Sequence, residues 1–581
     1  MRKKDFYFRD REIDVLVVGG GLAGVFASIK AKESGARRVV QVDKGSVGKS
    51  GNSCFAAGVM HIYFPQEDDL EDRVKRLTRS LGYIAQQDMI QTHLEDSFNI
   101  LQEMEKLGAD FLKTQDGKFE RRPGRGHYPI VMFRGPQMME SMKNASITKG
   151  VEHFNKIMIT DLLLRDGRVV GAVGFNIQNG DFYIFEAKAT VLATGSTFYK
   201  GLLPGHRDCT GDGYAAAYRA GAELSGADNN DMLTNLMPCR YDIGPGMNKF
   251  VGEGGRFLNT KHQRFMEKYN PTLKERAGLG ILTSSFCMEA KQGNTPIYMD
   301  MTHFTPEQVR RLREVLPLVM RMFERVGMVK NDKFTQLIEW MPCPPVARPG
   351  LVVNHRFETT LPGLYACGEA ASPQAVVTGL ASAATSGVRA GISAAEFTKM
   401  VSTLKADKDQ ISRLKEYVFQ PLNRKEGVEP DQILLSLQEA VIPYDALLLR
   451  NEERMKEALK EVEEIKYHQI PLLHAYDPHY LRMAHETQNL VTVGEIHLKT
   501  ALLRNESRIA LREDFPYTDN VNWLKWIKVK RRGEDMDIFL EEVPIERYPI
   551  KVERKKFLHH LWKLAQDQGI IHIKEDKVIW G

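Results

Sequence analysis

Cysteine is scarce in this sequence, with six residues in 581, and no two of them stand at the C-x-x-C spacing. An iron–sulfur cluster usually takes its four thiolates from closely spaced cysteines. The same scatter forms no disulfide framework, which is typical of a protein in a reducing compartment. We therefore expect this chain to hold neither an iron–sulfur cluster nor another metal ion.

Long apolar runs and an excess of charge are also missing. The most apolar stretch, residues 13–29, is interrupted by glycines and is shorter than the about 20 residues that span a bilayer. The basic residues 1–4 are followed by charged residues instead of the apolar run of a signal peptide, which predicts a cytoplasmic protein. The formal net charge is +5, and no long segment is dominated by lysine and arginine, so we expect no nucleic acid partner.

The chain opens with a strand–helix–strand pattern. Residues 13–18 read as a buried strand, residues up to about 34 as a helix of small side chains, and residues 38–43 as a second strand. Between the strands stands G-x-G-x-x-G, whose glycines allow a tight turn, a close approach to a pyrophosphate, and packing of helix on strand. An acid about 20 residues further on suits ribose hydroxyls. The pattern predicts a bound dinucleotide and leaves FAD and NAD both open.

Four later segments favour FAD. An apolar strand ends at residues 193–195, an acid at 212 opens a helical run, and small residues surround 368 and 369. With residues 49–53, these segments supply amides and small polar groups along an extended cofactor, more than a nicotinamide enzyme needs. The predicted FAD contacts are Gly19, Gly21, Gly24, Asp43, Lys44, Lys49, Ser50, Gly51, Asn52, Ala57, Gly58, Ala193, Thr194, Gly195, Asp212, Gly368, Glu369 and Ser382.

With 43% hydrophobic and 27% charged residues, the chain has the composition of a globular protein, long enough for several domains. We predict an α/β protein with a Rossmann-like FAD-binding domain split in sequence, an inserted α+β capping domain and a C-terminal helical domain. The predicted boundaries are 1–223 and 344–410 for the FAD-binding domain, 224–343 for the capping (substrate) domain, 411–522 for the helical domain, and 523–581 for a C-terminal extension.

Some elements are expected within these domains. Residues 70–107 carry helical periodicity, and residues 168–175 and 181–185 read as a hairpin turning at Asn179-Gly180. A separate buried strand is expected from residue 189. Near the end of the chain, residues 552–568 read as a basic helix, which is a candidate for docking a partner subunit.

These motifs resemble the fumarate reductase/succinate dehydrogenase flavoprotein family along nearly the whole chain. The matching segments are residues 19–24, 49–58, 210–213, 219–222, 363–372 and 505–516. Within the family the chain looks most similar to the α subunits of dissimilatory adenylylsulfate reductases, on residues 171–195, 237–240 and 293–298. The resemblance implies an oxidoreductase that takes a small anionic substrate at the flavin. It also implies a hetero-oligomer, in which electrons pass to or from a separate iron–sulfur, ferredoxin-like subunit.

The chain departs from the family's pattern at three places. Members that bind FAD covalently carry a histidine in the segment that is here 50–53, so the resemblance implies non-covalent FAD. Fumarate reductases carry His-Gly-Ala-Asn-Arg-Leu where this chain has residues 374–380, and a histidine-containing turn stands in the family where it has 345–350. The substrate therefore stays open between adenylylsulfate chemistry and a dicarboxylate or enoate. A third alternative is a subunit whose flavin only relays electrons.

Three side chains are the candidates for catalysis: Arg240, Arg348 and His61. Arginine binds oxyanions bidentately through its planar fork. The resemblance places Arg240 at the substrate site, and Arg348 precedes an FAD-contacting segment. His61 follows the loop expected to cover the flavin, where a histidine can exchange a proton. Further candidates are His127 and His206, whereas His355 is expected to face solvent.

Overall fold

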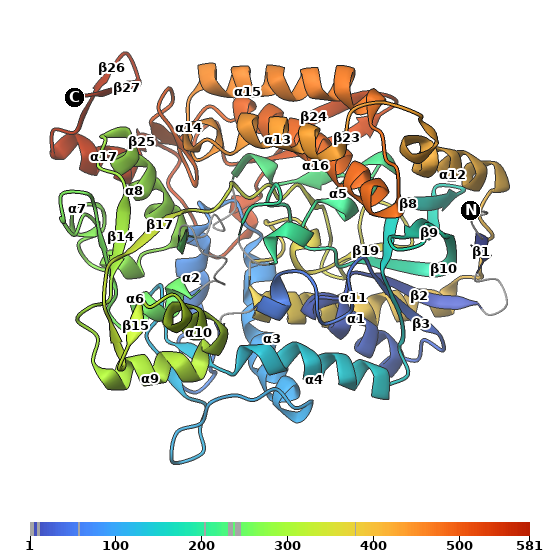
Figure 1. The fold of residues 1–581 in the computed structure, drawn as a ribbon, viewed down its shortest axis with the longest axis horizontal. Coiled ribbons are helices and arrows are strands. Elements are labelled where there is room, and N and C mark those ends of the chain that lie inside the picture. The colour runs from blue at the N-terminus through green and yellow to red at the C-terminus, as the bar shows by residue number, and fades with distance from the viewer. Residues whose placement is uncertain are drawn as a thin grey trace.

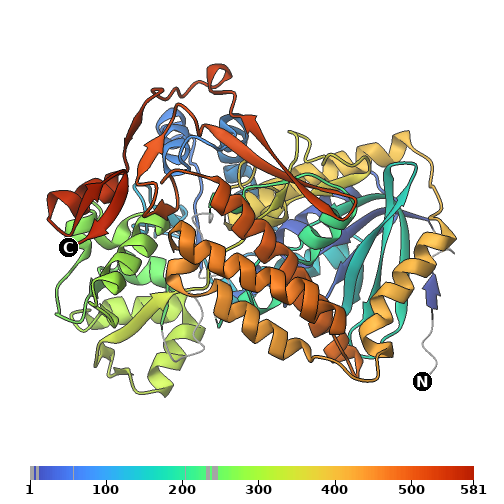
Figure 2. The ribbon, with the colours of Figure 1, turned by 90° about the horizontal axis from the view of Figure 1, so that it is seen from above.

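The computed structural model describes residues 5–7, 12–55, 58–202, 205–229, 236–238, 246–377 and 379–581. A large sheet with its helices lies at one end of the molecule, and a smaller sheet ringed by helices lies at the other (Figure 1). Helices from the last third of the chain run along one side of both (Figure 2). Among the described residues, no helix combines the length and the apolar composition needed to cross a membrane.

The large sheet has a parallel half, with strands in the order β7-β3-β2-β10-β19. These strands are β2 (Ile13–Val18), β3 (Val39–Asp43), β7 (Glu152–Asn155), β10 (Phe182–Leu192) and β19 (Leu364–Ala366). β2 and β3 are buried throughout, so both read as continuous apolar runs instead of alternating ones. Because β19 comes from far along the chain, the sheet confirms a Rossmann-like domain that is split in sequence. Parallel strands end at the same edge, so the loops after β2, β3, β10 and β19 meet there.

β10 is a single strand where the sequence predicts two. Its first half pairs antiparallel with β9 (Arg168–Asn176), which pairs with β8 (Ile157–Arg165), as the predicted hairpin requires. Its second half joins the parallel strands. The short strand β1 (Asp5–Tyr7) also pairs with the first half.

The expected break within β10 was wrong, because two charged residues that read as loop are buried with partners. A Glu186 carboxylate oxygen accepts from the Ala406 amide at 3.0 Å. Lys188 Nζ donates to Asp14 at 2.8 Å. Both side chains are more than nine-tenths buried. Satisfied in this way, charged residues are tolerated inside a buried strand.

Two helices cross tightly on one face of this sheet. They are α1 (Leu22–Glu33), which follows the glycine-rich turn, and α11 (Leu380–Met400). A Cβ atom added to Gly387 would lie 2.3 Å from the Ala23 carbonyl oxygen, and one added to Gly391 would lie 2.3 Å from that of Ala27. Glycine is therefore required in α11 at both contacts, and the close approach packs the first turns of α1 against residues 387–391 of α11.

The smaller sheet belongs to the inserted segment and has the antiparallel order β12-β17-β14-β13. Its strands are β12 (Leu236–Pro238), β13 (Arg256–Leu258), β14 (Ile297–Asp300) and β17 (Ile338–Pro342). Around it lie α6 (Met247–Gly252), α7 (Met266–Tyr269), α8 (Leu279–Lys291), α9 (Pro306–Val315), α10 (Pro317–Arg325) and the ribbon β15 (Val329–Lys330)–β16 (Lys333–Phe334). Phe250, Phe257, Phe286 and Trp340 pack edge-to-face in its core. The inserted segment is thus an α+β unit with a core of its own, as the fold class predicts.

The helical part contains α12 (Lys408–Asn423), α13 (Pro430–Val441), α14 (Tyr444–Leu447), α15 (Glu452–Glu464) and α16 (Pro478–Leu503). α16 is buried along most of its length. α15 is rich in charged residues, but Met455, Ala458 and Val462 recur about one turn apart and form a buried apolar stripe. Asn451 caps α15 by accepting from the Arg454 amide at 2.9 Å.

The C-terminal extension differs from its prediction. Residues 552–568 do not form one basic helix, because β25 (Lys556–Leu558) pairs antiparallel with β22 (Tyr517–Asp519). The helix α17 covers only His560–Asp567. The backbone of β25 is engaged in this ladder, so tertiary pairing overrides the helical pattern. The hairpin β26 (Ile571–Lys574)–β27 (Lys577–Trp580) follows.

A second hairpin of the extension ties distant parts of the chain together. β23 (Lys525–Arg532) pairs with β24 (Asp535–Glu542) and with β11 (Leu224–Ser225), and β11 pairs with β18 (Gly350–Leu351). The extension therefore contacts the start of the inserted segment, and β11 links it to the chain that follows that segment. In addition, β20 (Leu449–Arg450) pairs parallel with β21 (Leu511–Arg512).

The predicted helical region 70–107 forms two helices, α2 (Leu70–Ser80) and α3 (Gln87–Lys106), between the two sheets (Figure 1). Gly82 breaks them with a positive φ of 62°. The other elements near this region are α4 (Gly135–Thr148), α5 (Asp212–Arg219) and a sheet of β4 (Val59–Met60), β6 (Ile130–Met132) and β5 (Arg121–Arg122).

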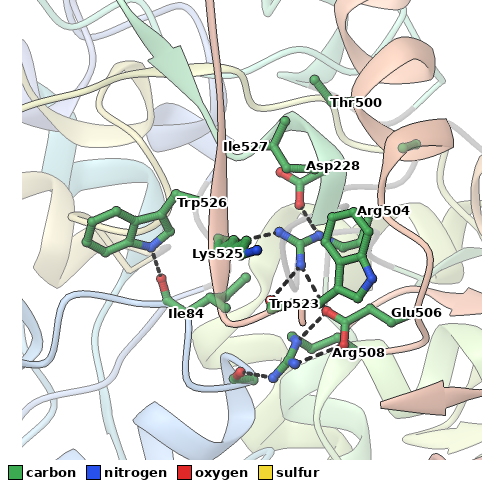
Figure 3. A network of polar contacts seen from close by, with 12 residues as sticks. Ile84, Asp228, Thr500, Arg504, Glu506, Arg508, Trp523, Lys525, Trp526 and Ile527 are labelled. Carbon is green, nitrogen blue, oxygen red and sulfur yellow. Dashed lines mark hydrogen bonds and ion pairs between the residues drawn. The ribbon is translucent and has the colours of Figure 1, made fainter. Parts of the chain in front are cut away.

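A buried polar network holds the turn between α2 and α3 (Figure 3). Glu506 accepts from Arg504 at 2.9 Å and from Arg508 at 2.6 and 2.8 Å. Arg504 also donates to Asp228 at 2.5 Å, and Arg508 donates to the Gly82 carbonyl at 2.7 Å. All four charged side chains are more than nine-tenths buried. The network therefore joins the end of α16 to the turn that positions α2.

Candidate active site

One cavity of about 920 Å³ runs from the edge of the large sheet to the inserted segment. At the sheet edge it is lined by the loops after β2, β3, β10 and β19 and by the start of α11. Its far part is lined by α2, α3, residues 125–128 and the inserted segment. The predicted cofactor contacts that line the cavity are Gly19, Gly21, Asp43, Lys44, Ser50, Gly51, Asn52, Ala193, Thr194, Gly195, Asp212, Gly368, Glu369 and Ser382.

The glycine-rich turn leaves no room for a side chain. Gly19 has a φ of 114°, and a Cβ there would lie 2.3 Å from the Ala193 carbonyl oxygen. A Cβ on Gly24 would lie 2.1 Å from the Gly19 carbonyl oxygen. Asp43 braces the turn by accepting from the Gly20 amide at 2.7 Å and from Ser50 Oγ at 2.6 Å. This cradle of backbone and small side chains fits the pyrophosphate and ribose of a dinucleotide.

Beside this turn, Lys44 lies between two acids. Its ammonium is 2.8 Å from Asp212 and 2.7 Å from Glu486, which stands on α16. These charges raise the pKa of Lys44 although its burial opposes the shift, and Glu486 shows the matching lowered pKa. Asn489 of α16 donates to Asp212 at 3.0 Å. The helical part thus fixes the charged side chains of the nucleotide end.

The remaining predicted cofactor contacts lie elsewhere. Gly24 sits at the contact of α1 with the turn, and Lys49 pairs with Glu140 away from the cavity lining. Gly58 has a φ of 65°, and its Cβ position lies 2.5 Å from the Phe133 carbonyl oxygen. Ala57 lies outside the described residues. Contact of these residues with the cofactor stays a prediction.

The candidate catalytic residues are separated. His61, directly after β4, lines the cavity. Arg348 is buried and donates to the carbonyl oxygens of Glu369 at 3.3 Å, Ala371 at 3.3 Å and Val376 at 2.8 Å, so it holds the 369–376 segment. Arg240 lies outside the described residues, and its predicted role stays a prediction.

The further histidines differ in position. His127 lines the cavity. His206 is buried and stacks on Phe198 with 3.5 Å between the ring centroids, and it is not among the lining residues. His355 pairs with Asp88 at 3.0 Å, and its side chain is 64% exposed. Of these three, only His127 is placed to meet a substrate.

Arg125 lines the cavity as well, although it is not among the residues predicted for the site. It follows Gly124 in the Gly124-Arg125-Gly126-His127 segment, and an arginine flanked by glycines was the available signal. Its guanidinium makes no hydrogen bond or ion pair with any described residue, and Nε is buried. Burial lowers the pKa of Arg125 to about 10, which still leaves it charged at neutral pH.

His61 lies in the electrostatic field of this arginine. Burial lowers the pKa of His61 to about 4, and the positive charges of Arg125 and Arg73 act in the same direction. His93, also in the cavity wall, has a pKa lowered to about 4 by burial, and its ring contacts Ser382 at 3.2 Å. Both rings are therefore neutral at pH 7 and act as hydrogen-bonding groups without adding charge.

Profiles of known families match this chain in two blocks. The family described as "FAD binding domain" matches residues 14–388, and "Fumarate reductase flavoprotein C-term" matches residues 436–557. The chain belongs to the fumarate reductase/succinate dehydrogenase flavoprotein family. The flavoprotein is an FAD-dependent oxidoreductase, which confirms the predicted cofactor.

Relatives and solved structures span the flavoprotein almost completely. One subunit of the fumarate reductase (CoM/CoB) from Methanothermobacter marburgensis is 27% identical over 557 residues, 90% of this chain and 98% of that protein. An uncharacterised FAD-dependent oxidoreductase of Methanocaldococcus jannaschii is 28% identical over 87% of this chain and 94% of its own length.

Two solved structures show the same fold. Quinol fumarate reductase from E. coli has a TM-score of 0.83 at 22% identity and covers 95% of this chain and 99% of that one. Adenylylsulfate reductase from Archaeoglobus fulgidus has a TM-score of 0.79 at 21% identity and covers 96% and 98%.

We predict that the flavoprotein releases its FAD when it is denatured. Residues 50–53 offer no histidine for a covalent bond to the flavin. Heat or acid precipitation of the holoprotein should leave FAD in the supernatant, where fluorescence measures it. Flavin that stays with the precipitate through washing in denaturant would contradict non-covalent binding.

We also predict a loss of stability in mild acid. Burial lowers the pKa of His206 and of His559 to about 3, beside the values of about 4 for His61 and His93. An unfolded histidine has a pKa near 6.5, so below that pH the unfolded chain binds protons that the folded chain excludes. The stabilisation is complete above pH ~6.5 and is lost as the pH falls toward ~4.

The melting temperature, measured with excess FAD, should fall between pH 7 and pH ~4.5. The fall should be shallower in His206→Phe, which replaces one of the buried imidazoles with a ring that does not titrate. The His355→Asn control changes an exposed histidine and should follow the wild type. Parallel curves for wild type and His206→Phe would contradict this assignment.

Proposed function

We propose that the flavoprotein is the FAD-containing, redox-active subunit of a complex and acts on a small oxyanionic substrate at its non-covalently bound flavin. The observation that carries this proposal is the cavity itself, because one space joins the nucleotide cradle to the unpaired Arg125 guanidinium. A half-buried arginine with a buried, unsatisfied Nε and no acid beside it is costly unless an anion completes it. When bound, FAD supplies the capacity to exchange two electrons with that substrate.

In this proposal Arg125 binds the oxyanion, and the neutral His61 ring donates or accepts a hydrogen bond or a proton beside it. We keep Arg240 as a second residue that binds the same oxyanion, because the resemblance places it at the substrate site. Arg348 acts by holding the 369–376 segment, which is consistent with its three carbonyl contacts.

We further propose that a separate iron–sulfur protein exchanges electrons with the flavin in a hetero-oligomer. Several relatives are named as subunits, which supports an assembly. The cysteine spacing of the chain favours clusters on another polypeptide.

Two substrate classes remain in the proposal. One is adenylylsulfate and its products, sulfite and AMP, as the similarity to adenylylsulfate reductases suggests. The other is an enoate or dicarboxylate, as in the fumarate reductases. The proposal competes with a pure relay, in which the flavin exchanges electrons only with proteins.

An anaerobic redox titration separates these alternatives. Holoprotein reduced by dithionite should be reoxidised by adenylylsulfate or by an enoate, with the flavin absorbance as readout. Oxidised holoprotein should be reduced by sulfite plus AMP only in the first case. Reduced ferredoxin should reduce the flavin in every case. If no oxyanion changes the flavin while ferredoxin does, the relay is correct and the proposed enzyme is wrong.

A further inference from the structure

The far part of the cavity carries one half-buried positive charge, that of Arg125, which pairs with no acid among the described residues. Arg73 lies 2.8 Å from Asp68, and Arg76 lies 2.6 Å from Asp72. Arg79 also lines the cavity, but its side chain is exposed, where water solvates the charge. Arg125 has neither an acid nor solvent around Nε. A single anionic group balances the charge of Arg125.

Several apolar side chains line the far part of the cavity, beside polar ones such as Arg76, His127 and Asn270. The apolar side chains are Leu77 from α2, Leu94 from α3, Leu273, Leu279 and Ile281 from the inserted segment, and Val377, which directly follows the segment that Arg348 holds. Burial of apolar surface favours a ligand with a hydrocarbon body at about 25 cal/mol per Å². A second carboxylate or a phosphate placed against these side chains would lose its hydration and gain no hydrogen bond.

Arg125 is held in place by two residues of the inserted segment. Arg276 donates to the carbonyl oxygens of Gly124 at 2.8 Å and Gly126 at 3.2 Å, and Asn248 accepts from the Arg125 amide at 2.6 Å. A Cβ on Gly124 would lie 2.7 Å from the Asn248 side-chain oxygen, so Asn248 packs closely against this backbone. These contacts fix the backbone and leave the guanidinium itself for a ligand. Arg276 and Asn248 are positioning residues.

We infer that the substrate is a monocarboxylate with an apolar body, whose carboxylate pairs with Arg125 and whose body lies against the leucine-rich wall. This inference rests on the proposed function. For the flavin to exchange electrons with it, the substrate has a carbon–carbon double bond conjugated with the carboxylate. Two electrons and two protons add across that bond, the π bond is lost, and two C–H bonds form. Reduced FAD would supply the two electrons, the two protons would come from the reduced cofactor and the solvent, and the iron–sulfur partner would reduce the cofactor again.

Ligand binding to the oxidised holoprotein tests the inference without turnover. Calorimetry would compare crotonate and cinnamate with fumarate, adenylylsulfate and methyl cinnamate, which keeps the body of cinnamate and lacks its charge. Cinnamate should bind most tightly. Fumarate, adenylylsulfate and the ester should bind roughly 10-fold or more weakly, because none of them combines a single negative charge with an apolar body. This comparison uses the wild-type protein and does not depend on the folding of a variant.

Variants then test the assigned residue. Arg125→Gln should weaken cinnamate binding roughly 10- to 100-fold and leave binding of the ester unchanged, because it removes a charged hydrogen-bond donor. Arg125→Lys should lose less. Arg122→Gln, on the neighbouring β5, is the matched control and should bind as the wild type does.

The outcomes separate the two proposals. If fumarate or adenylylsulfate binds more tightly than cinnamate, or Arg125→Gln binds cinnamate as the wild type does, the monocarboxylate inference is overturned and the oxyanion enzyme stands. If Arg240→Gln rather than Arg125→Gln removes binding, the anion site is assigned wrongly. If no oxyanion binds the holoprotein or reoxidises its flavin, the proposed function fails as well.

Discussion

Gly24→Ala is expected to yield a protein that retains FAD roughly 10- to 100-fold more weakly than the wild type. The added Cβ would stand 2.1 Å from the Gly19 carbonyl oxygen. Neither atom is at the end of a flexible side chain, so relief requires α1 to move away from β2. That movement displaces the backbone of the glycine-rich turn and the start of α1, against which the pyrophosphate is expected to lie.

Fluorescence of FAD displaced by dilution or dialysis measures this effect. Gly280→Ala, in α8, is the matched control, because its Cβ would have its nearest neighbour at 3.8 Å. The control should retain FAD as the wild type does, with an unchanged circular dichroism spectrum in both variants. Stoichiometric FAD in purified Gly24→Ala at the wild-type affinity would contradict the cofactor assignment of this turn.

Glu506→Gln should lower the free energy of unfolding by about 3–5 kcal/mol, the cost of breaking a buried ion pair from one side. Besides Arg504 and Arg508, Glu506 accepts from the Asp519 amide at 2.9 Å. A neutral amide leaves Arg504 with Asp228 and removes the acid with which the buried Arg508 pairs (Figure 3). The substitution also places the NH₂ group of the amide, which is a donor, against the donors that the carboxylate accepts from.

The loss should be largest where the network meets α2. Arg508 holds the Gly82 carbonyl, and Trp526 Nε1 donates to the Ile84 carbonyl at 2.6 Å. Hydrogen exchange should therefore quicken around residues 80–90 before the rest of the protein. Thermal unfolding with excess FAD gives the stability change, and Glu452→Gln, which breaks the surface pair with Lys456, should change it by less than ~1 kcal/mol. Equal melting curves for Glu506→Gln and Glu452→Gln would contradict the role of the network.

The nucleotide end was predictable because its determinants are local in sequence. The turn from Gly19 to Gly24 needs glycine for steric reasons that hold wherever the motif occurs. The strands β2 and β3 are recognisable in the sequence as mainly apolar runs. The segments after β10 and β19 are rich in small residues, as the glycine-rich turn is. By contrast, β10 was split in two because the partners of Glu186 and Lys188 lie 220 and 174 residues away.

The substrate end was not predictable to the same degree. The residues near Arg125 in the sequence do not reveal that it lacks an acidic partner. That feature follows from the packing of the segments around residues 73, 248 and 276. Arg348 is a second example, and its predicted catalytic role stays a prediction. Its Pro349-Gly350 context indicates a turn but not a direction, and in the structure the guanidinium points to backbone carbonyls rather than into the cavity.

A crystal structure of the oxidised holoprotein with 3-phenylpropionate, the saturated and unreactive counterpart of cinnamate, tests the central claim most directly. We predict that the flavin and the ligand share one cavity, with the carboxylate oxygens within hydrogen-bond distance of Arg125 and the phenyl ring against Leu273 and Leu279. A ligand bound outside this cavity, or within it with its carboxylate away from Arg125, would contradict the account.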